Sequence, residues 1–311
     1  MASSNVAFVF PGQGSQWVGM GRDLYEHSQA ARTVFRLADE ILDFPISRLC
    51  FEGPEDKLKA TLNAQPAILT VSLACLEAAT EAGGNNLPVP SFVAGHSLGE
   101  YTALAAVGVF DYQTAIFLAC ERGRLMHIAG NKSPGGMAAV LGLDENILAE
   151  ICSETGVRIA NYNSPGQLVI SGAVENIARA STLAKEKGAA RVIPLSVSGA
   201  FHTKFMEPAV EQMEKIFEKV TFSTPAVPVI ANTTAAPMTT VEQIKDELIA
   251  QLANGIQWQR SVEYMANQGI STFMEIGPGK VLTGLIKRTI KDASTVNIDG
   301  MEAINNLATL K

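Results

Sequence analysis

The sequence predicts an α/β protein in which a small α+β unit interrupts a large domain built on a parallel sheet. Short apolar runs each end at a glycine-rich turn and lead into a helical pattern. This strand–turn–helix order is typical of parallel sheets. Such runs occur toward both ends of the chain, whereas the order of elements changes between residues 133 and 198. The change predicts a separate unit inserted into the larger one.

The large domain is predicted to comprise residues 1–132 and 199–311. Its strands are expected at 6–10, 92–94, 227–231 and 272–276, where apolar runs are closed by turn residues. Helices are expected at 21–42 and 101–107, which carry apolar residues at helical spacing, and after Gly277-Pro-Gly-Lys280. Because the strands come from both ends of the chain, we expect the two segments to share one sheet.

The insert, residues 133–198, follows the order βαββαβ, which is the ferredoxin-like arrangement. Its strands are expected at 137–141, 157–161, 167–171 and 190–195, and its helices at 144–154 and 174–187. Asp144 is the expected N-cap of the first helix, and Pro165-Gly166 is the expected turn between the two middle strands. We expect a cleft where the insert meets the large domain.

Composition limits the classes of protein to which this chain can belong. The 311 residues are 47% hydrophobic and 18% charged, which is typical of a packed globular protein. The net charge is −7, whereas nucleic-acid-binding proteins are usually basic. No uninterrupted apolar stretch reaches the roughly 18 residues of a membrane span. The first residues lack the basic and then apolar segments of a signal peptide. The four cysteines lack the spacing of metal ligands. We expect a cytoplasmic protein that binds no nucleic acid, membrane or metal.

Ser97 is the strongest candidate for a catalytic residue. It is the centre of Gly95-His-Ser-Leu-Gly99, a G-x-S-x-G motif between a predicted strand and a predicted helix. This context is typical of a nucleophile elbow. The glycines allow a sharp turn that lifts Ser97 Oγ clear of the sheet and points the N–H of Leu98 at the space beside it. The alternative is an ordinary Gly/Ser turn.

A serine nucleophile needs a base, and the chain has four histidines, at His27, His96, His127 and His202. The first lies in a charged surface helix, the second lies inside the elbow and the third lies at a helix end. His202 follows the last strand of the insert, from which it can reach across the cleft, so it is the candidate base. The alternative is a histidine that only packs within its loop.

Arg122 and the first glycine-rich loop complete the set of candidates. Arg122 lies in an otherwise apolar helical stretch, where it either pairs with a local acid such as Glu121 or Glu100, or faces the cleft and grips a carboxylate. The loop Pro11-Gly-Gln-Gly-Ser-Gln16 lacks the glycine spacing of a nucleotide-binding loop. It is better suited to offering a second backbone N–H to an oxyanion at the elbow.

Six motifs together resemble the malonyl-CoA:acyl carrier protein transacylase family, in the same order and over residues 6–290. They are Phe10-Pro-Gly-Gln-Gly-Ser-Gln16, Gly95-His-Ser-Leu-Gly-Glu100, Arg122, Gly199-Ala-Phe-His-Thr203, Gln257-Trp258 and Gly277-Pro-Gly-Lys280. The resemblance implies an α/β-hydrolase-like large domain. Because the sequence ends close to the last motif, we expect the free-standing enzyme of fatty acid synthesis rather than a domain of a polyketide synthase.

The resemblance also implies a two-step acyl transfer without a permanently bound cofactor. Ser97 would attack the thioester of malonyl-CoA, and coenzyme A would leave a malonyl-serine ester behind. The phosphopantetheine thiol of holo acyl carrier protein would then take the malonyl group. His202 would serve first as base and then as acid.

For the other positions the resemblance implies specific roles. The backbone N–H groups of Gln13 and Leu98 hold the oxyanion, and Arg122 pairs with the malonyl carboxylate. A main-chain carbonyl at Gln257 orients the histidine in place of a triad carboxylate. Phe201 crowds the pocket and so excludes an α-methyl group.

Three other functions are weighed against this one. An esterase of the α/β-hydrolase type shares G-x-S-x-G, but it follows the chain order Ser, acid, His and uses an HGGG-type oxyanion loop that is absent here. A trans-acting acyltransferase of a polyketide synthase would use the same chemistry as the transacylase. A scaffold that binds the carrier protein without turnover would have no need of an intact Ser97, His202 and Arg122.

Docking of the carrier protein needs a local basic patch. The carrier proteins of this family are acidic and this chain is acidic too, so attraction between the whole molecules cannot explain binding. Candidate residues near the predicted cleft loops are Arg191, Lys204, Lys280, Lys287 and Arg288. The alternative is that these are ordinary solvated surface charges.

Overall fold

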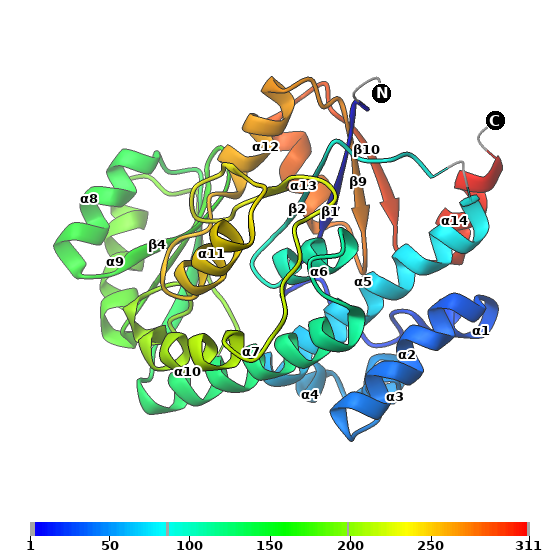
Figure 1. Ribbon diagram of the computed structural model, residues 1–311. Coiled ribbons are helices and arrows are strands. Elements are labelled where there is room, and N and C mark those ends of the chain that lie inside the picture. Colours follow the sequence, from blue (N-terminus) through cyan, green and yellow to red (C-terminus); the bar gives the residue numbers. More distant parts are fainter. Residues whose placement is uncertain (1–3, 85–86, 198, 310–311) are drawn as a thin grey trace.

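The computed structural model describes residues 4–84, 87–197 and 199–309 and has the predicted α/β class (Figure 1). Within these residues the larger sheet has six strands in the order β10-β9-β1-β2-β7-β8. All neighbouring strands are parallel except β7 and β8. The strands are β1 Val6–Phe10, β2 Phe92–Gly95, β7 Val229–Ile230, β8 Pro237–Met238, β9 Thr272–Ile276 and β10 Ser294–Ile298. The four predicted strands are confirmed, and β8 and β10 are additional.

Helices cover both faces of the larger sheet, as the alternation of side chains in β1 requires. Phe8 and Phe10 pack into the main core, whereas Ala7 and Val9 pack on the opposite face, in a core that includes residues of α12 and α13. The helices outside the insert are α1 Arg22–His27, α2 Gln29–Leu42, α3 Ile46–Glu52, α4 Glu55–Lys59, α5 Thr61–Gly83, α6 Gly99–Ala106, α7 Tyr112–Lys132, α10 Glu207–Phe217, α11 Val241–Ala253, α12 Trp258–Asn267, α13 Val281–Thr289 and α14 Met301–Thr309, with a 3-10 turn at Lys204–Met206.

The single helix predicted over 21–42 is two helices, so that prediction is wrong at Ser28. The backbone of Ser28 is extended, and its Oγ accepts a hydrogen bond from the N–H of Ala31 at 3.0 Å. A serine in this position caps a new helix, because its side chain satisfies an N–H group that has no intrahelical partner. The periodicity of apolar residues continues across the break and therefore conceals it.

One helix of the described residues, α5, is long and apolar enough to cross a membrane by length and composition alone. Of its most apolar window, 83% is buried inside the protein. It packs against α2 and α7, and its residues form much of the main core. We therefore interpret α5 as a core helix.

The smaller sheet has the predicted ferredoxin-like order. Its strands run β4-β5-β3-β6, and every neighbouring pair is antiparallel. Asp144 caps the first helix of this unit as predicted, accepting the N–H of Asn146 at 2.8 Å. The elements are β3 Gly136–Leu141, α8 Glu145–Thr155, β4 Arg158–Ser164, β5 Gln167–Gly172, α9 Val174–Glu186 and β6 Arg191–Pro194.

The domain boundaries at 132/133 and 198/199 stay a prediction. Ser198, where the predicted insert ends, lies outside the described residues, as do residues 1–3, 85–86 and 310–311 of the predicted large domain.

Hydrogen bonds join the smaller sheet to the larger part of the molecule. The N–H of Tyr162 in β4 donates to the carbonyl of Ile256 at 2.8 Å, and the N–H of Ile256 donates to the carbonyl of Ala160 at 2.9 Å. Arg260 in α12 also pairs with Glu145 in α8 at 2.7 Å. The segment between α11 and α12 therefore forms the junction with the insert, and this junction positions one side of the candidate site.

Candidate active site

Ser97 stands in a strained turn between β2 and α6. Its φ is 52°, in the left-handed region that residues other than glycine rarely adopt. The turn passes so close to β1 that a Cβ atom on Gly99 would lie 2.1 Å from the carbonyl oxygen of Phe10. Only glycine fits there, so the local sequence permits the elbow. Ser97 lines a pocket that it shares with His202 and Arg122.

His202 reaches Ser97 across this pocket. Its Nε2 atom lies 2.8 Å from Ser97 Oγ, and its Nδ1 atom lies 2.7 Å from the backbone carbonyl oxygen of Gln251. Because a carbonyl only accepts hydrogen bonds, Nδ1 carries the proton and Nε2 is free to accept the serine proton. Burial, aided by the positive charge of Arg122, lowers the pKa of His202 to about 3. The imidazole is therefore neutral near pH 7, as a general base must be.

The carbonyl that orients His202 belongs to Gln251, so the prediction of Gln257 is wrong. The carbonyl oxygen of Gln257 accepts hydrogen bonds from the N–H and the hydroxyl of Ser261, in the first turn of α12. Gln251 lies in the last turn of α11, where carbonyl groups have no partner inside the helix. The carbonyl of Gln251 is for that reason available to a side chain.

Arg122 lies beside Ser97 and is almost completely buried, with 1% of its surface exposed. Its Nη1 donates to Gln65 Oε1 and its Nη2 donates to Gln251 Oε1, each at 2.6 Å. Nη2 also lies 3.1 Å from Ser97 Oγ. The guanidinium is thus held by neutral amides and points at the nucleophile.

Neither acid considered from the sequence pairs with Arg122. Glu121 forms an ion pair with Arg124, and Glu100 accepts hydrogen bonds from amide groups. No carboxylate of the described residues lies within ion-pair distance of Arg122. A buried cation that lacks a carboxylate of its own is suited to bind one from a substrate.

Gln13 and Leu98 supply two backbone N–H groups at the same pocket. Across the described ranges neither group has a hydrogen-bond acceptor. The first glycine-rich loop lies directly against the elbow, because a Cβ atom on Gly12 would lie 2.3 Å from the carbonyl oxygen of His96. Leu98 immediately precedes α6, and the N-terminus of a helix favours negative charge. Two donors suited to an oxyanion therefore lie at the pocket of the nucleophile.

The rest of the pocket wall is mainly apolar. Phe201 is 5% exposed and precedes the histidine, and Asn161 and His96 add polar groups. His96 Nε2 bonds to Asn163 Oδ1 at 2.9 Å. The apolar side chains of the wall are Met126, Met137, Leu195, Val197 and Phe201. A narrow apolar pocket with a buried cation at the nucleophile suits a short acyl group that ends in a carboxylate.

Sequence reasoning missed Asn232 and Gln251, which lie behind Ser97, and it considered Glu100 only as an ion-pair partner of Arg122. Glu100 gave one usable signal, since it is a carboxylate in an otherwise apolar helix directly after the elbow. Asn232 gave a signal of position, since it directly follows the predicted strand at 227–231. Gln251 is one of two glutamines in α11, and nothing in the sequence distinguishes it from the other.

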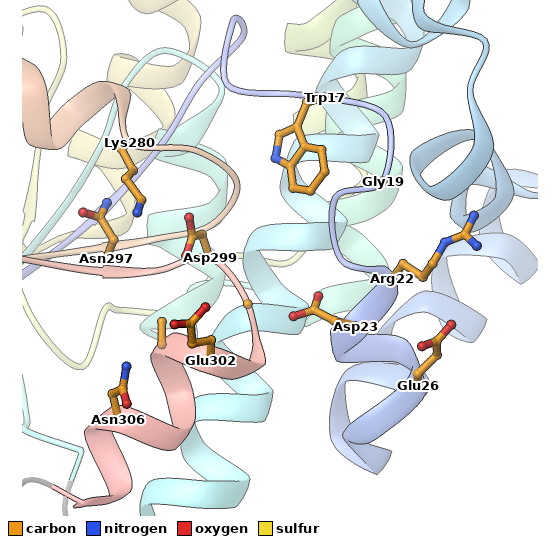
Figure 2. Close-up of a pocket in the computed structure, with 12 residues that line it drawn as sticks. Trp17, Gly19, Arg22, Asp23, Glu26, Lys280, Asn297, Asp299, Glu302 and Asn306 are labelled. Carbon is orange, nitrogen blue, oxygen red and sulfur yellow. The ribbon is translucent and has the colours of Figure 1, made fainter.

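A wider groove lies elsewhere, between the loop after β1 and the start of α14. Figure 2 shows Trp17, Lys280, Asp299 and Glu302 around it. Asp23 in this groove accepts the N–H of Met301 at 2.7 Å, so its carboxylate holds the end of a helix. Among the described residues that line the groove, no serine or cysteine is paired with a histidine. The chemistry is therefore assigned to the pocket at Ser97.

Comparison with known proteins shows the family of the chain. The model of the acyl transferase domain family matches residues 7–306. A malonyl CoA-acyl carrier protein transacylase of Bacillus subtilis (strain 168) is 44% identical over 314 residues, which cover 99% of this chain and 98% of that protein.

Solved structures are similar over the same length. An acyl carrier protein S-malonyltransferase from Vibrio cholerae has a TM-score of 0.92 and 40% identity, covering 98% of this chain and all of that one. A malonyl-transacylase in complex with its type II PKS acyl-carrier protein has a TM-score of 0.94 and 37% identity, covering 99% of this chain and all of that one.

Proposed function

This chain belongs to the malonyl CoA-acyl carrier protein transacylases of the acyl transferase family, and we propose that it transfers a malonyl group from malonyl-CoA to the phosphopantetheine thiol of an acyl carrier protein through an ester on Ser97. One observation supports the roles proposed for Ser97, His202 and Arg122. A neutral imidazole and a buried guanidinium converge on Ser97 Oγ, at 2.8 and 3.1 Å. The imidazole prepares the nucleophile, and the guanidinium recognises charge at the far end of the acyl group.

In the first step Ser97 Oγ attacks the carbonyl carbon of the thioester while His202 Nε2 takes its proton. The carbonyl oxygen becomes an oxyanion, which the N–H groups of Gln13 and Leu98 stabilise. The intermediate then collapses, the carbon–sulfur bond breaks and the proton on His202 passes to the departing thiol. The product is a malonyl ester of Ser97 and free coenzyme A.

The second step reverses the order with a different thiol. His202 takes the proton of the phosphopantetheine thiol, whose sulfur attacks the ester carbonyl, and the same two N–H groups hold the new oxyanion. Collapse breaks the bond to Ser97 Oγ, which regains a proton from His202. Side chains and backbone groups of this chain supply every function in both steps, so the proposal needs no resident cofactor.

Arg122 distinguishes this proposal from an esterase. An enzyme that acts on neutral esters gains nothing from a buried guanidinium at its nucleophile, whereas a malonyl group presents a carboxylate that can pair with it. Among the described residues no carboxylate hydrogen-bonds to His202, which also favours a transferase over an esterase. The backbone carbonyl of Gln251 supplies the orientation that a triad carboxylate gives in esterases.

The acceptor is proposed to dock at exposed basic residues, and the protein is proposed to work in the cytoplasm. Lys204, Lys280, Lys287, Arg191 and Arg288 are all exposed. Fatty acid synthesis is the proposed pathway, and supply of a polyketide carrier protein is the second candidate, since one similar structure holds such a partner.

Intact-protein mass tests the assignment. Brief incubation with malonyl-CoA should add one malonyl group to the wild-type protein, and holo acyl carrier protein should remove it. Acetyl-CoA and the Ser97→Ala variant are the controls and should give no adduct. Free malonate accumulating without an adduct would instead indicate a hydrolase.

A further inference from the structure

Glu100 is fully buried behind the nucleophile, and the steps above give it no role. The backbone N–H of Asn232 donates to its Oε1 at 2.9 Å, and the side-chain Nδ2 of Asn232 donates to the same atom at 3.0 Å. The side-chain Nε2 of Gln251 donates to its Oε2 at 2.6 Å. All three partners are donors, so both carboxylate oxygens act as acceptors.

These hydrogen bonds determine which way two amides point. An amide side chain has one donor end and one acceptor end, and Glu100 binds the donor end of each. The acceptor end of Asn232 therefore faces the N–H of Ser97, at 2.7 Å. The acceptor end of Gln251 faces Nη2 of Arg122 at 2.6 Å, while its Nε2 also donates to the carbonyl of Ser97 at 2.8 Å. The Nδ2 of Asn232 also donates to the backbone carbonyl of Gly95 at 2.7 Å. Both polar backbone groups of the strained serine are thus held by amides that Glu100 helps to orient.

Glu100 also lies close to Arg122 without touching it. One neutral amide, that of Gln251, lies between the guanidinium and the carboxylate. Burial lowers the pKa of Arg122, and attraction to Glu100 is among the effects that oppose this. A direct ion pair would occupy the paired N–H groups with which a guanidinium binds a carboxylate. The indirect arrangement leaves the Nε of Arg122, which has no hydrogen-bond partner among the described residues, available to a substrate.

We propose that Glu100 is a positioning residue, which orients the amides of Asn232 and Gln251 and through them holds the nucleophile and the arginine in place. The inference rests on the transferase function proposed above. A second buried acid, Glu247, provides the contrast. It accepts hydrogen bonds from the N–H and hydroxyl of Thr233, and among the described residues no side-chain hydrogen bond joins it to the amide of Asn232 or Gln251. It acts on Glu100 only through its charge, which raises the pKa of Glu100.

The test compares Glu100→Gln with Glu247→Gln, which replaces a neighbouring buried carboxyl group in the same way. In Glu100→Gln the new NH₂ group faces the NH₂ group of Asn232 or Gln251, and two donors cannot pair. The amide that meets it must therefore rotate. Its own NH₂ group then points at the N–H of Ser97, in the case of Asn232, or at Arg122, in the case of Gln251. The rate constant for acylation of Ser97 by malonyl-CoA, corrected for the folded fraction, should fall roughly 10- to 100-fold. In Glu247→Gln it should stay within about threefold of the wild-type value.

Two further readouts separate positioning from simple destabilisation. The Tm should fall in both variants, whereas labelling of Ser97 by a neutral fluorophosphonate should slow only in Glu100→Gln. A Glu100→Gln protein that labels and acylates at wild-type rates overturns the proposal, as does an equal loss in both variants. A wild-type protein that labels but takes no malonyl group contradicts the proposed function instead, and the labelling rates still test Glu100.

A second variant covers the case in which Glu100→Gln does not fold. Gln251→Met removes the amide but keeps the backbone carbonyl that binds His202. The preference for malonyl-CoA over acetyl-CoA should then fall at least tenfold, because Arg122 loses both its acceptor and its link to Glu100. An unchanged preference would overturn the proposal.

Discussion

The Oγ atom of Ser97 and the Nε2 atom of His202 lie 2.8 Å apart, although 105 residues separate them in the chain. Both residues have positive φ angles, 52° and 60°. Such conformations cost energy in residues other than glycine and persist only where surrounding contacts enforce them. The backbone itself, and not only side-chain rotation, therefore sets the geometry of this pair.

The pH dependence of acylation follows from the buried histidine. The pKa of His202 is lowered from 6.5 to about 3, so the base remains neutral well below pH 6.5. We expect kcat/KM for malonyl-CoA to show no acid limb near pH 6.5. Single-turnover acylation between pH 5 and 8 checks this, and a limb at the ordinary histidine pKa would contradict it.

The same shift makes stability depend on pH. Between pH 6.5 and about 3 the unfolded chain binds a proton at His202 that the folded chain does not. The free energy of unfolding contributed by this residue is therefore fully present above pH 6.5 and decreases as the pH falls through that window. Urea titrations of the wild type and His202→Ala should show a smaller decrease on acidification in the variant.

Arg122 should control the preference for a charged acyl group. Replacing it by alanine removes charge-assisted hydrogen bonds to the malonyl carboxylate, and we expect kcat/KM for malonyl-CoA to fall roughly 10- to 100-fold or more. Arg124→Ala is the matched control, since Arg124 lies on the same helix but pairs with Glu121 at the surface. Steady-state rates with malonyl-CoA and acetyl-CoA measure the effect, and equal losses in both variants would refute it.

The elbow should not tolerate a methyl group at Gly99. A Cβ atom there would lie 2.1 Å from the Phe10 carbonyl oxygen, so Gly99→Ala should lower the free energy of unfolding by roughly 3 kcal/mol or more and abolish fluorophosphonate labelling. Gly284→Ala is the control, because a Cβ atom on Gly284 in α13 meets nothing within 4 Å. That change should stabilise the helix by about 0.5–1 kcal/mol.

Charge reversal at Lys287 and Arg288 tests the docking of the carrier protein. Both residues are exposed in the last turn of α13. If they face the acidic partner, the double change to glutamate should raise KM for the carrier protein roughly tenfold and leave KM for malonyl-CoA unchanged. Lys59→Glu, at an exposed pair with Glu55, is the control. An unchanged KM for the carrier protein would exclude this patch.

Local sequence patterns predicted much of the fold, and they predicted that Ser97, His202 and Arg122 belong to the site. β1 and β9 have their predicted bounds, and the order of strands in the insert follows from counting its elements. Ser97 stands out in the sequence by its G-x-S-x-G motif, and His202 stands out because the chain has only four histidines. A break such as that at Ser28 escapes a periodicity argument, since a cap changes the backbone without changing the apolar spacing.

The hydrogen bonds that Glu100, Asn232 and Gln251 form behind Ser97 could not be predicted from single residues. The carbonyl that holds His202 is a main-chain group, which every residue carries, so only the end point of α11 identifies Gln251. Glu100 and Asn232 act through hydrogen bonds that span 132 residues. Such pairings depend on where the strands and helices are placed in space, and no local spacing encodes them.

The junction between β4 and Ile256 limits how this enzyme can be shortened or recombined with a relative. A chain trimmed to the larger sheet would leave the backbone N–H and carbonyl of Ile256 without their partners in β4, and it would deprive His96 of Asn163. The second loss falls at the residue that precedes Ser97. A minimal acyl-transfer scaffold must therefore keep both sheets, and a chimera that exchanges the insert with a relative must exchange the matching stretch before α12 as well.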